Sequence, residues 1–359
     1  MPRIALIGTP QTGKTTLWCA LTGADYQTAL QQAGQAGGKA RVGISKIEDA
    51  RLSRLSAHFR PKKHTPAVAE FADSTAIQLT SEGREKNGVI LANLRNETDG
   101  LCLVVPAWKP ENPSVLRTEA EIKAEIEAIA TEFVFADLAI AETRIEKLKV
   151  QVTKPTPTRE RDQKELDVLK VLHAAFSEGK PAAGVALKGE DAKLVKGFRF
   201  LSEKPLVVAL NLPETAVGKA PSVGGYSVVP ICAKLELELL GMEAEERAAF
   251  MGDYGLTELA TPALVQACFR SLGLQYFFTA GEDECRAWII RKGDDAVEAA
   301  SKIHSDLARG FVAAEVVSFA DWEAAAGDMK VVKARARLRQ EGKGYIVADG
   351  DIVNIKSGV

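Results

Sequence analysis

The segment Gly8-Thr-Pro-Gln-Thr-Gly13-Lys14-Thr15 constrains this chain more than any other stretch of its sequence. It fits the pattern G-x-x-x-x-G-K-[ST], and it lies between a short apolar run, Arg3 to Leu6, and a helical pattern that starts at Lys14. A strand, a glycine-containing turn and a helix in this order predict a loop whose backbone N–H groups face a polyphosphate. The alternative is a glycine-rich turn with a fortuitous Lys-Thr pair. We expect the loop to bind phosphate through Gly8, Thr9, Pro10, Gln11, Thr12, Gly13, Lys14, Thr15 and Thr16.

Two side chains of this segment have further predicted roles. Lys14 adds a full positive charge near the β- and γ-phosphates and is the candidate catalytic residue, whereas the Thr15 hydroxyl can ligate Mg²⁺. A P-loop needs a carboxylate that orients the metal at the end of a later strand. Asp73 closes the run from Val68 to Asp73 and is the candidate for this role. The alternative for Asp73 is an ordinary turn after a strand. The expected ligands are therefore Mg²⁺ and a purine nucleoside triphosphate, ATP or GTP.

A later segment is a candidate for recognition of the base. The run from Leu206 to Asn211 continues as Asn211-Leu-Pro-Glu214, which gives N-x-x-E where guanine-binding proteins have N-K-x-D. An Asp at the last position accepts hydrogen bonds from guanine N1–H and the 2-amino group, and a longer Glu shifts those acceptors. A plain turn is the alternative. The candidate residues here and in the loop after the next strand are Asn211, Leu212, Glu214, Cys232 and Ala233.

Compact apolar runs recur along the first two thirds of the chain. They are typical of buried strands, with helical sequence between several of them, and lie at Val68–Ala72, Leu101–Val105, Leu206–Asn211 and Val228–Cys232. Such alternation predicts an α/β fold in which a mostly parallel sheet has helices on both faces.

Two regions depart from this alternation. Apolar residues at helical spacing (Ile122, Ile126, Ile129 and Phe133, then Ile145 and Leu148) predict a long helix, and a Pro/Thr turn at Lys154–Thr158 precedes a second apolar stripe. We expect an antiparallel hairpin whose seam is this stripe, with a cofactor groove as the alternative. After Leu274, β-like runs at Gln275–Thr279, Ala287–Ile290 and Tyr345–Val347, with a helix near Asp294–Asp306, predict a small domain. The predicted domains are residues 1–116 with 205–273, residues 117–204, and residues 274–359.

Composition excludes some classes of protein. A formal net charge of -2 excludes a protein that coats nucleic acid through general basicity. The five cysteines are odd in number and lack paired C-x-x-C spacing, which favours buried thiols over disulfides or zinc. The N-terminus lacks a signal-peptide pattern and the apolar runs are shorter than a membrane span, so we expect a cytoplasmic protein without a membrane partner.

A local basic run is a candidate contact for ribosomal or other RNA. It consists of Lys330, Lys333, Arg335, Arg337 and Arg339, on an expected helix. The alternative is a solvated helix face balanced by Glu341. Trp288 and His304 could likewise stack on RNA bases, but a packed aromatic core is the favoured interpretation.

Taken together, these motifs resemble the YchF/Obg-like ATPase family. The resemblance spans nearly the whole chain and is closest in the C-terminal third, at Tyr276–Gly281, Arg286–Trp288, Lys302–His304, Gly310-Phe311 and Gly344–Asp351. It implies a Ras-like P-loop nucleotide-binding domain with a helical-hairpin insertion and a C-terminal α+β, ubiquitin-like TGS domain. It also implies preference for ATP over GTP, slow Mg²⁺-dependent hydrolysis and association with ribosomes, and it places Leu212 against the base.

Gln11 departs from the family pattern, which usually has Asn there, and three groups that related GTPases use in hydrolysis are absent from this chain. The metal-coordinating Thr of switch I aligns near Gly37, the switch II Gly is Ala76, and the next residue, Ile77, cannot orient an attacking water. Hydrolysis is therefore expected to be very slow or lost. The functional hypotheses are a slow ATPase acting as a nucleotide-dependent switch, a non-hydrolysing nucleotide-binding protein that associates with ribosomes or RNA, and a GTPase; we expect a monomer.

Overall fold

The computed structural model describes residues 1–33, 40–80 and 85–358. The chain forms two compact units, one built from Met1–Ile44 with Glu70–Leu264, the other from Ser45–Ala69 with Val265 and the residues that follow. The predicted boundaries at 116, 204 and 273 stay a prediction. The second unit includes residues 45–69, which the sequence analysis placed in the nucleotide-binding domain.

The first unit is built on a sheet whose strand order, in the described part of the chain, is β2-β4-β1-β5-β8-β9. The last five strands of this order pair in parallel. Every residue of β5 is buried, as expected for a central strand covered on both faces. The α/β prediction is confirmed. The strands are β1 (Arg3–Ile7), β2 (Arg41–Ile47), β4 (Ala67–Asp73), β5 (Gly100–Pro106), β8 (Leu206–Asn211) and β9 (Val228–Ile231).

Helices cover this sheet, because the connections between parallel strands must return across its faces. One apolar core joins strands β1, β5 and β8 to α5 (Asn87–Glu97) and the first half of α6 (Glu119–Gln151). Helix α1 (Lys14–Thr22) packs against α9 (Ala233–Leu240). The remaining elements of this unit include α2 (Tyr26–Ala33), β6 (Trp108–Lys109), β7 (Asn112–Leu116) and α10 (Ala244–Asp253), and α11 (Ala260–Ser271) begins in it.

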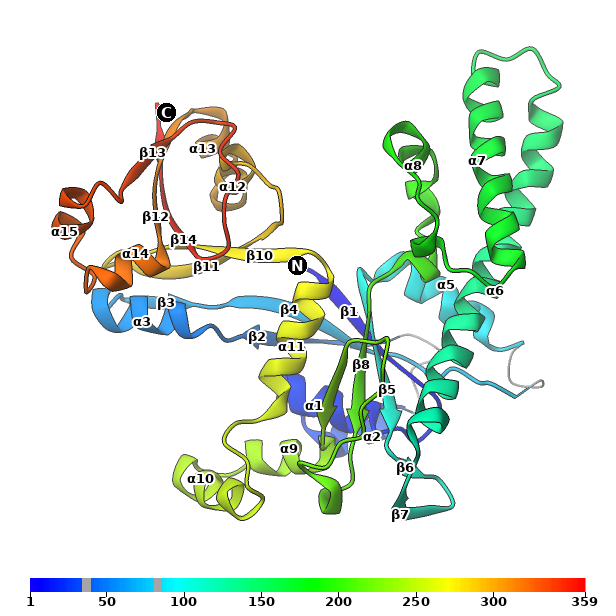
Figure 1. The fold of residues 1–359 in the computed structure, drawn as a ribbon, viewed down its shortest axis with the longest axis horizontal. Coiled ribbons are helices and arrows are strands. Elements are labelled where there is room, and N and C mark those ends of the chain that lie inside the picture. The colour runs from blue at the N-terminus through cyan, green and yellow to red at the C-terminus, as the bar shows by residue number, and fades with distance from the viewer. Residues whose placement is uncertain (34–39, 81–84, 359) are drawn as a thin grey trace. The chain divides into compact units, whose positions relative to one another are not determined.

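The predicted hairpin is present as α6 and α7 (Arg159–Ser177), which extend together from the sheet (Figure 1). A capping box starts α6, in which the Thr118 side chain accepts from the N–H of Glu121 and Glu121 accepts from the N–H of Thr118. Arg144 Nε donates to Glu165 Oε1 at 2.6 Å and joins the two helices. The turn between them lies where Lys154–Thr158 predicts it.

The prediction that the whole apolar stripe forms the hairpin's seam was wrong for its first half. Ile122, Ile126, Ile129 and Phe133 are buried in the sheet's core. Only the later positions, including Ile145 and Leu148, pack against α7 and the short helix α8 (Gly189–Val195). Helix α6 therefore contributes to two cores. Helical periodicity does not reveal this division, because packing against the sheet and packing against α7 require the same spacing of apolar residues.

The second unit contains a mixed sheet with strand order β13-β12-β14-β10-β11-β3 in the described residues. Helix α12 (Ala296–Ile303) packs three alanines into a core that includes Phe277 and Val316, an α+β arrangement. The strands are β3 (Lys63–Thr65), β10 (Leu274–Thr279), β11 (Glu284–Arg291), β12 (Phe311–Ser318), β13 (Arg339–Glu341) and β14 (Asp351–Ser357), and the other helices include α3 (Ala50–Phe59), α13 (Ser305–Arg309), α14 (Phe319–Ala324) and α15 (Met329–Ala334).

Three predictions for this unit need correction. The run Tyr345–Val347 was expected to be a strand. In the structure it makes a single isolated bridge, between Ile346 and Asp295, although Val347 is buried. The expected basic helix ends at Ala334, so Arg337 lies beyond it and Arg339 begins β13. Trp288 does pack against this core, with its ring stacked on Phe277, but His304 is exposed and caps α13.

Two further expectations concern side-chain burial and membrane segments. All five cysteines are buried free thiols, and this includes Cys285 beside Arg286. Within residues 1–33, 40–80 and 85–358, no helix combines the length and apolarity that a membrane span requires.

Candidate functional site

The loop between β1 and α1 has a backbone shape that its glycines make accessible. Gly8 has a φ of 146°, and a Cβ there would lie 2.6 Å from the carbonyl oxygen of Val104 on β5. Gly13 has a φ of 90°, and a Cβ there would lie 2.3 Å from Asn211 Nδ2. Gln11 also adopts a left-handed backbone, with a φ of 62°. The loop is thus packed against two neighbouring strands at positions where only glycine fits.

Lys14 folds back over this loop. Its Nζ donates to the Thr9 carbonyl oxygen at 2.7 Å and to the Gly8 carbonyl oxygen at 3.2 Å, and it lies 3.5 Å from Thr12 Oγ1. Burial lowers the pKa of Lys14 to about 8, and the negative charges of Asp73 and Glu125 partly oppose this effect. A buried ammonium whose hydrogen bonds here go to neutral oxygens gains strongly from an anion, so the loop is suited to phosphate.

The predicted metal-site residues lie together at the ends of α1 and β4. Thr15 Oγ1 donates to Asp73 Oδ2 at 2.9 Å, and the Asp73 side chain is only 4% exposed. Hydroxyl and carboxylate oxygens are the donors that Mg²⁺ prefers, so the residues fit the implied ion. Arg41 was not among the predicted site residues, but its guanidinium forms an ion pair with the same Asp73 oxygen. No local pattern marks Arg41, because only the strand order brings β2 beside β4.

Asn211 connects the loop to the segment after β9. Its Nδ2 donates to the Thr12 carbonyl oxygen at 2.9 Å, and its Oδ1 accepts from the N–H of Ala233 at 3.0 Å. Asn211 is 5% exposed and Thr12 is fully buried. The structure therefore brings three separately predicted segments together, since the carboxyl ends of parallel strands meet at one edge of the sheet.

The other candidate base-binding residues have varied environments. Leu212 is buried in the sheet's core, and its N–H donates to the Ile231 carbonyl oxygen at 2.8 Å. Glu214 Oε1 lies 2.7 Å from Lys234 Nζ in an ion pair. Cys232 is the N-cap residue of α9, and burial raises the pKa of its thiol. Roles of these residues in contacting a base stay predictions.

The region after β4 is packed without a polar side chain at the position expected to orient water. Ile77 is fully buried in the sheet's core, and its N–H donates to the Gly8 carbonyl oxygen at 3.0 Å. Ala76, the other switch II departure, is partly buried. The switch I position Gly37 lies outside the described residues.

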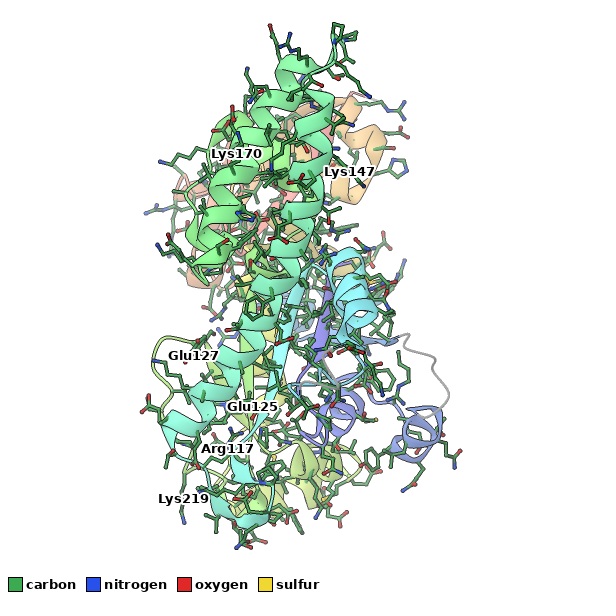
Figure 2. The ribbon with its side chains drawn as sticks, turned by 90° about the vertical axis from the view of Figure 1, so that its right-hand side faces the viewer. Arg117, Glu125, Glu127, Lys147, Lys170 and Lys219 are labelled. Carbon is green, nitrogen blue, oxygen red and sulfur yellow. The ribbon has the colours of Figure 1, made fainter. Side chains whose placement is uncertain are left out.

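A second contact that was not predicted joins the phosphate loop to the hairpin. Thr9 Oγ1 donates to Glu125 Oε1 at 2.8 Å, and Glu125 Oε2 accepts from Arg117 Nη1. Arg117 further donates to the Glu121 carbonyl oxygen at 2.6 Å. Figure 2 shows Arg117 and Glu125 at the end of the hairpin nearest the sheet, with Lys147 at the far end of the same helix. The first helix of the hairpin thus touches the loop directly.

Comparisons with known proteins agree with this geometry. Residues 274–357 match a family model named YchF-GTPase_C, described as a protein of unknown function. The chain is 34% identical to the "Ribosome-binding ATPase YchF" of Bacillus subtilis, over 99% of this chain and 98% of the relative. It is 31% identical to the protein of the same name from Escherichia coli O157:H7, over 98% of each.

A solved structure shares the fold. The YchF GTPase of Schizosaccharomyces pombe superposes with a TM-score of 0.81 over 99% of this chain and 97% of that chain, at 21% sequence identity. The comparisons of sequence and of fold each cover nearly the whole chain. With relatives more than 30% identical along almost its entire sequence, the chain belongs to the YchF family.

Proposed function

We propose that this protein binds a purine nucleoside triphosphate with Mg²⁺, prefers ATP to GTP, hydrolyses it slowly, and acts as a nucleotide-dependent switch on ribosomes in the cytoplasm. The arrangement around Lys14 carries the proposal. A buried ammonium and the Thr15–Asp73 pair lie at one sheet edge, beside the loop. The relatives named ribosome-binding ATPases support the choice of nucleotide and partner.

Preference for ATP is supported by the state of Glu214. Guanine recognition requires a carboxylate that is free to accept from two N–H groups of the base. The Glu214 carboxylate is instead paired with Lys234, and adenine does not present those two donors in that arrangement.

Slow hydrolysis follows from the chemistry that the site offers. Ile77 has no polar atoms in its side chain, and its burial holds it away from any attacking water. Lys14 and the loop amides would position and neutralise the phosphates, and bound Mg²⁺ would supply further charge stabilisation through Thr15 and Asp73. These groups hold the triphosphate but do not activate water.

The contact between Thr9 and Glu125 supports a switch. Phosphate bound in the loop places negative charge near the Glu125 carboxylate, and the resulting repulsion acts on α6, which is 33 residues long. Because α6 is one continuous helix and forms half of the hairpin, a shift of its first turns would be carried along it toward the hairpin's tip. The hairpin is accordingly the element that would report nucleotide state to a partner.

Calorimetric titration with ATP and GTP, each with Mg²⁺ and with EDTA, tests binding and base choice. Lys14→Ala should abolish binding. Lys204→Ala is the matched control, because burial lowers the pKa of Lys204 to about 8 as well. The Lys204 Nζ also donates to a backbone carbonyl oxygen, that of Thr98, which lies at the opposite edge of the sheet from the loop. Equal affinity of wild type and Lys14→Ala for ATP would refute the proposal.

Two further measurements test the remaining parts of the proposal. Single-turnover hydrolysis, with Lys14→Ala as background, separates a slow ATPase from a protein that binds without hydrolysis. Co-sedimentation with ribosomes in the presence of ATP, ADP or neither tests the switch. Ribosome binding that is the same in all three conditions would contradict it.

A further inference from the structure

Arg41 places a positive charge on the two groups expected to face Mg²⁺. Its Nη2 donates to Asp73 Oδ2 and lies 3.4 Å from Thr15 Oγ1. That same Asp73 oxygen accepts the Thr15 hydroxyl at 2.9 Å. In this arrangement the oxygen atoms suited to a metal are already in contact with a cation that belongs to the protein.

Several contacts hold the Arg41 guanidinium in this place. Its Nη1 donates to the Ala29 carbonyl oxygen, and its Cζ lies 5.2 Å from the ring centroid of Trp18. The Trp18 indole is itself fixed, because its Nε1 donates to the Phe71 carbonyl oxygen at 2.9 Å. The Arg41 side chain is 15% exposed, so water screens this ion pair weakly. The pair is therefore a built part of the site.

A guanidinium and a divalent ion on the same carboxylate oxygen repel each other in a weakly screened environment, so occupancy by one disfavours the other. We infer that Arg41 competes with Mg²⁺ for Asp73 and Thr15, so that the ion pair must open before the metal binds. The inference rests on the proposed nucleotide binding. It follows that Mg²⁺ improves ATP affinity in this protein less than it would at the same site without Arg41.

Replacing the arginine by a neutral residue isolates its charge. Arg41→Gln keeps a polar side chain with a hydrogen-bond donor but removes the charge, so the metal no longer displaces a cation. Arg41→Lys retains the charge without the planar fork and serves as a second variant. Arg3→Gln is the matched control, because Arg3 Nε donates to Glu70 Oε2 at 2.6 Å and joins β1 to β4 in the same sheet.

The measured quantity is the ratio of the dissociation constants for ATP in EDTA and in Mg²⁺, obtained by calorimetry on the full chain. We expect a ratio below about tenfold for wild type and Arg3→Gln, and a rise of at least about tenfold in Arg41→Gln, with Arg41→Lys close to wild type. Circular dichroism verifies that each variant is folded.

Distinct results overturn the inference. An unchanged ratio in Arg41→Gln shows that Arg41 does not compete, and loss of Mg²⁺-dependent binding shows that it helps to build the site. A wild-type ratio of about a thousandfold overturns the inference without any variant. If wild type binds neither ATP nor GTP in either buffer, the proposed function itself fails and the inference falls with it.

Discussion

Asn211 is the side chain whose removal tests most directly how the loop is held. Truncation to alanine removes the partner of the Thr12 carbonyl oxygen and the partner of the Ala233 N–H. Each buried backbone group left without a partner costs about 1–3 kcal/mol, which gives about 2–6 kcal/mol for both. The truncation also leaves room for a water, so we expect the lower half of this range.

The assay combines urea denaturation with ATP titration. We expect Asn211→Ala to lower the free energy of unfolding by about 2–4 kcal/mol and to weaken ATP binding by about tenfold or more, because the loop must be ordered at the expense of binding energy. Asn87→Ala is the matched control. Asn87 is 2% exposed, accepts from the Gln78 N–H at 3.0 Å and donates to the Gln78 carbonyl oxygen at 2.9 Å.

The control should lose comparable stability while it retains most of its ATP affinity. If Asn211→Ala loses less than about 1 kcal/mol, the two hydrogen bonds do not brace the loop. If both variants lose affinity equally, the effect reflects general destabilisation. Either result would refute the reasoning that Asn211 acts through the Thr12 and Ala233 backbone.

Three further predictions concern the loop and its support. Burial lowers the pKa of Lys14 from 10.5 to about 8 in the folded protein. Between these pH values the unfolded chain binds more protons than the folded chain. The free energy of unfolding of the nucleotide-free protein should therefore rise with pH through this window. ATP requires the protonated amine, so its dissociation constant should rise about tenfold per pH unit above pH 8, a slope that Lys14→Arg removes in calorimetric titrations. Gly13→Ala should abolish ATP binding in the same assay. Gly23→Ala is its control, because Gly23 has a φ of 70° and no atom lies within 4 Å of the added Cβ. This control should retain ATP binding and lower the free energy of unfolding, measured in urea, by only about 1–2 kcal/mol. Ile129→Ala and Leu169→Ala should each cost about 2–5 kcal/mol, but only Ile129→Ala, which opens a cavity in the sheet's core, should weaken ATP binding; equal effects would contradict the division of α6 between two cores.

Local patterns predicted the elements of the site well. The strand before Gly8, the helix from Lys14 and the strand that ends at Asp73 all lie where apolar runs and the glycine spacing place them. The hairpin was also predicted, since 3.6-residue periodicity and a Pro-containing turn are local signals. The first half of the α6 stripe was assigned to the wrong partner, because periodicity shows that a face is buried and not what buries it.

By itself, the sequence determined the loop, its lysine and the α/β alternation, because φ preferences, hydrophobic spacing and side-chain chemistry act over a few residues. Only the tertiary structure placed Arg41 on Asp73 and Glu125 on Thr9. These partners lie 32 and 116 residues apart, and strand order together with helix packing brings them into contact. Electrostatic contacts of this kind depend on distance in space, for which sequence separation provides no measure.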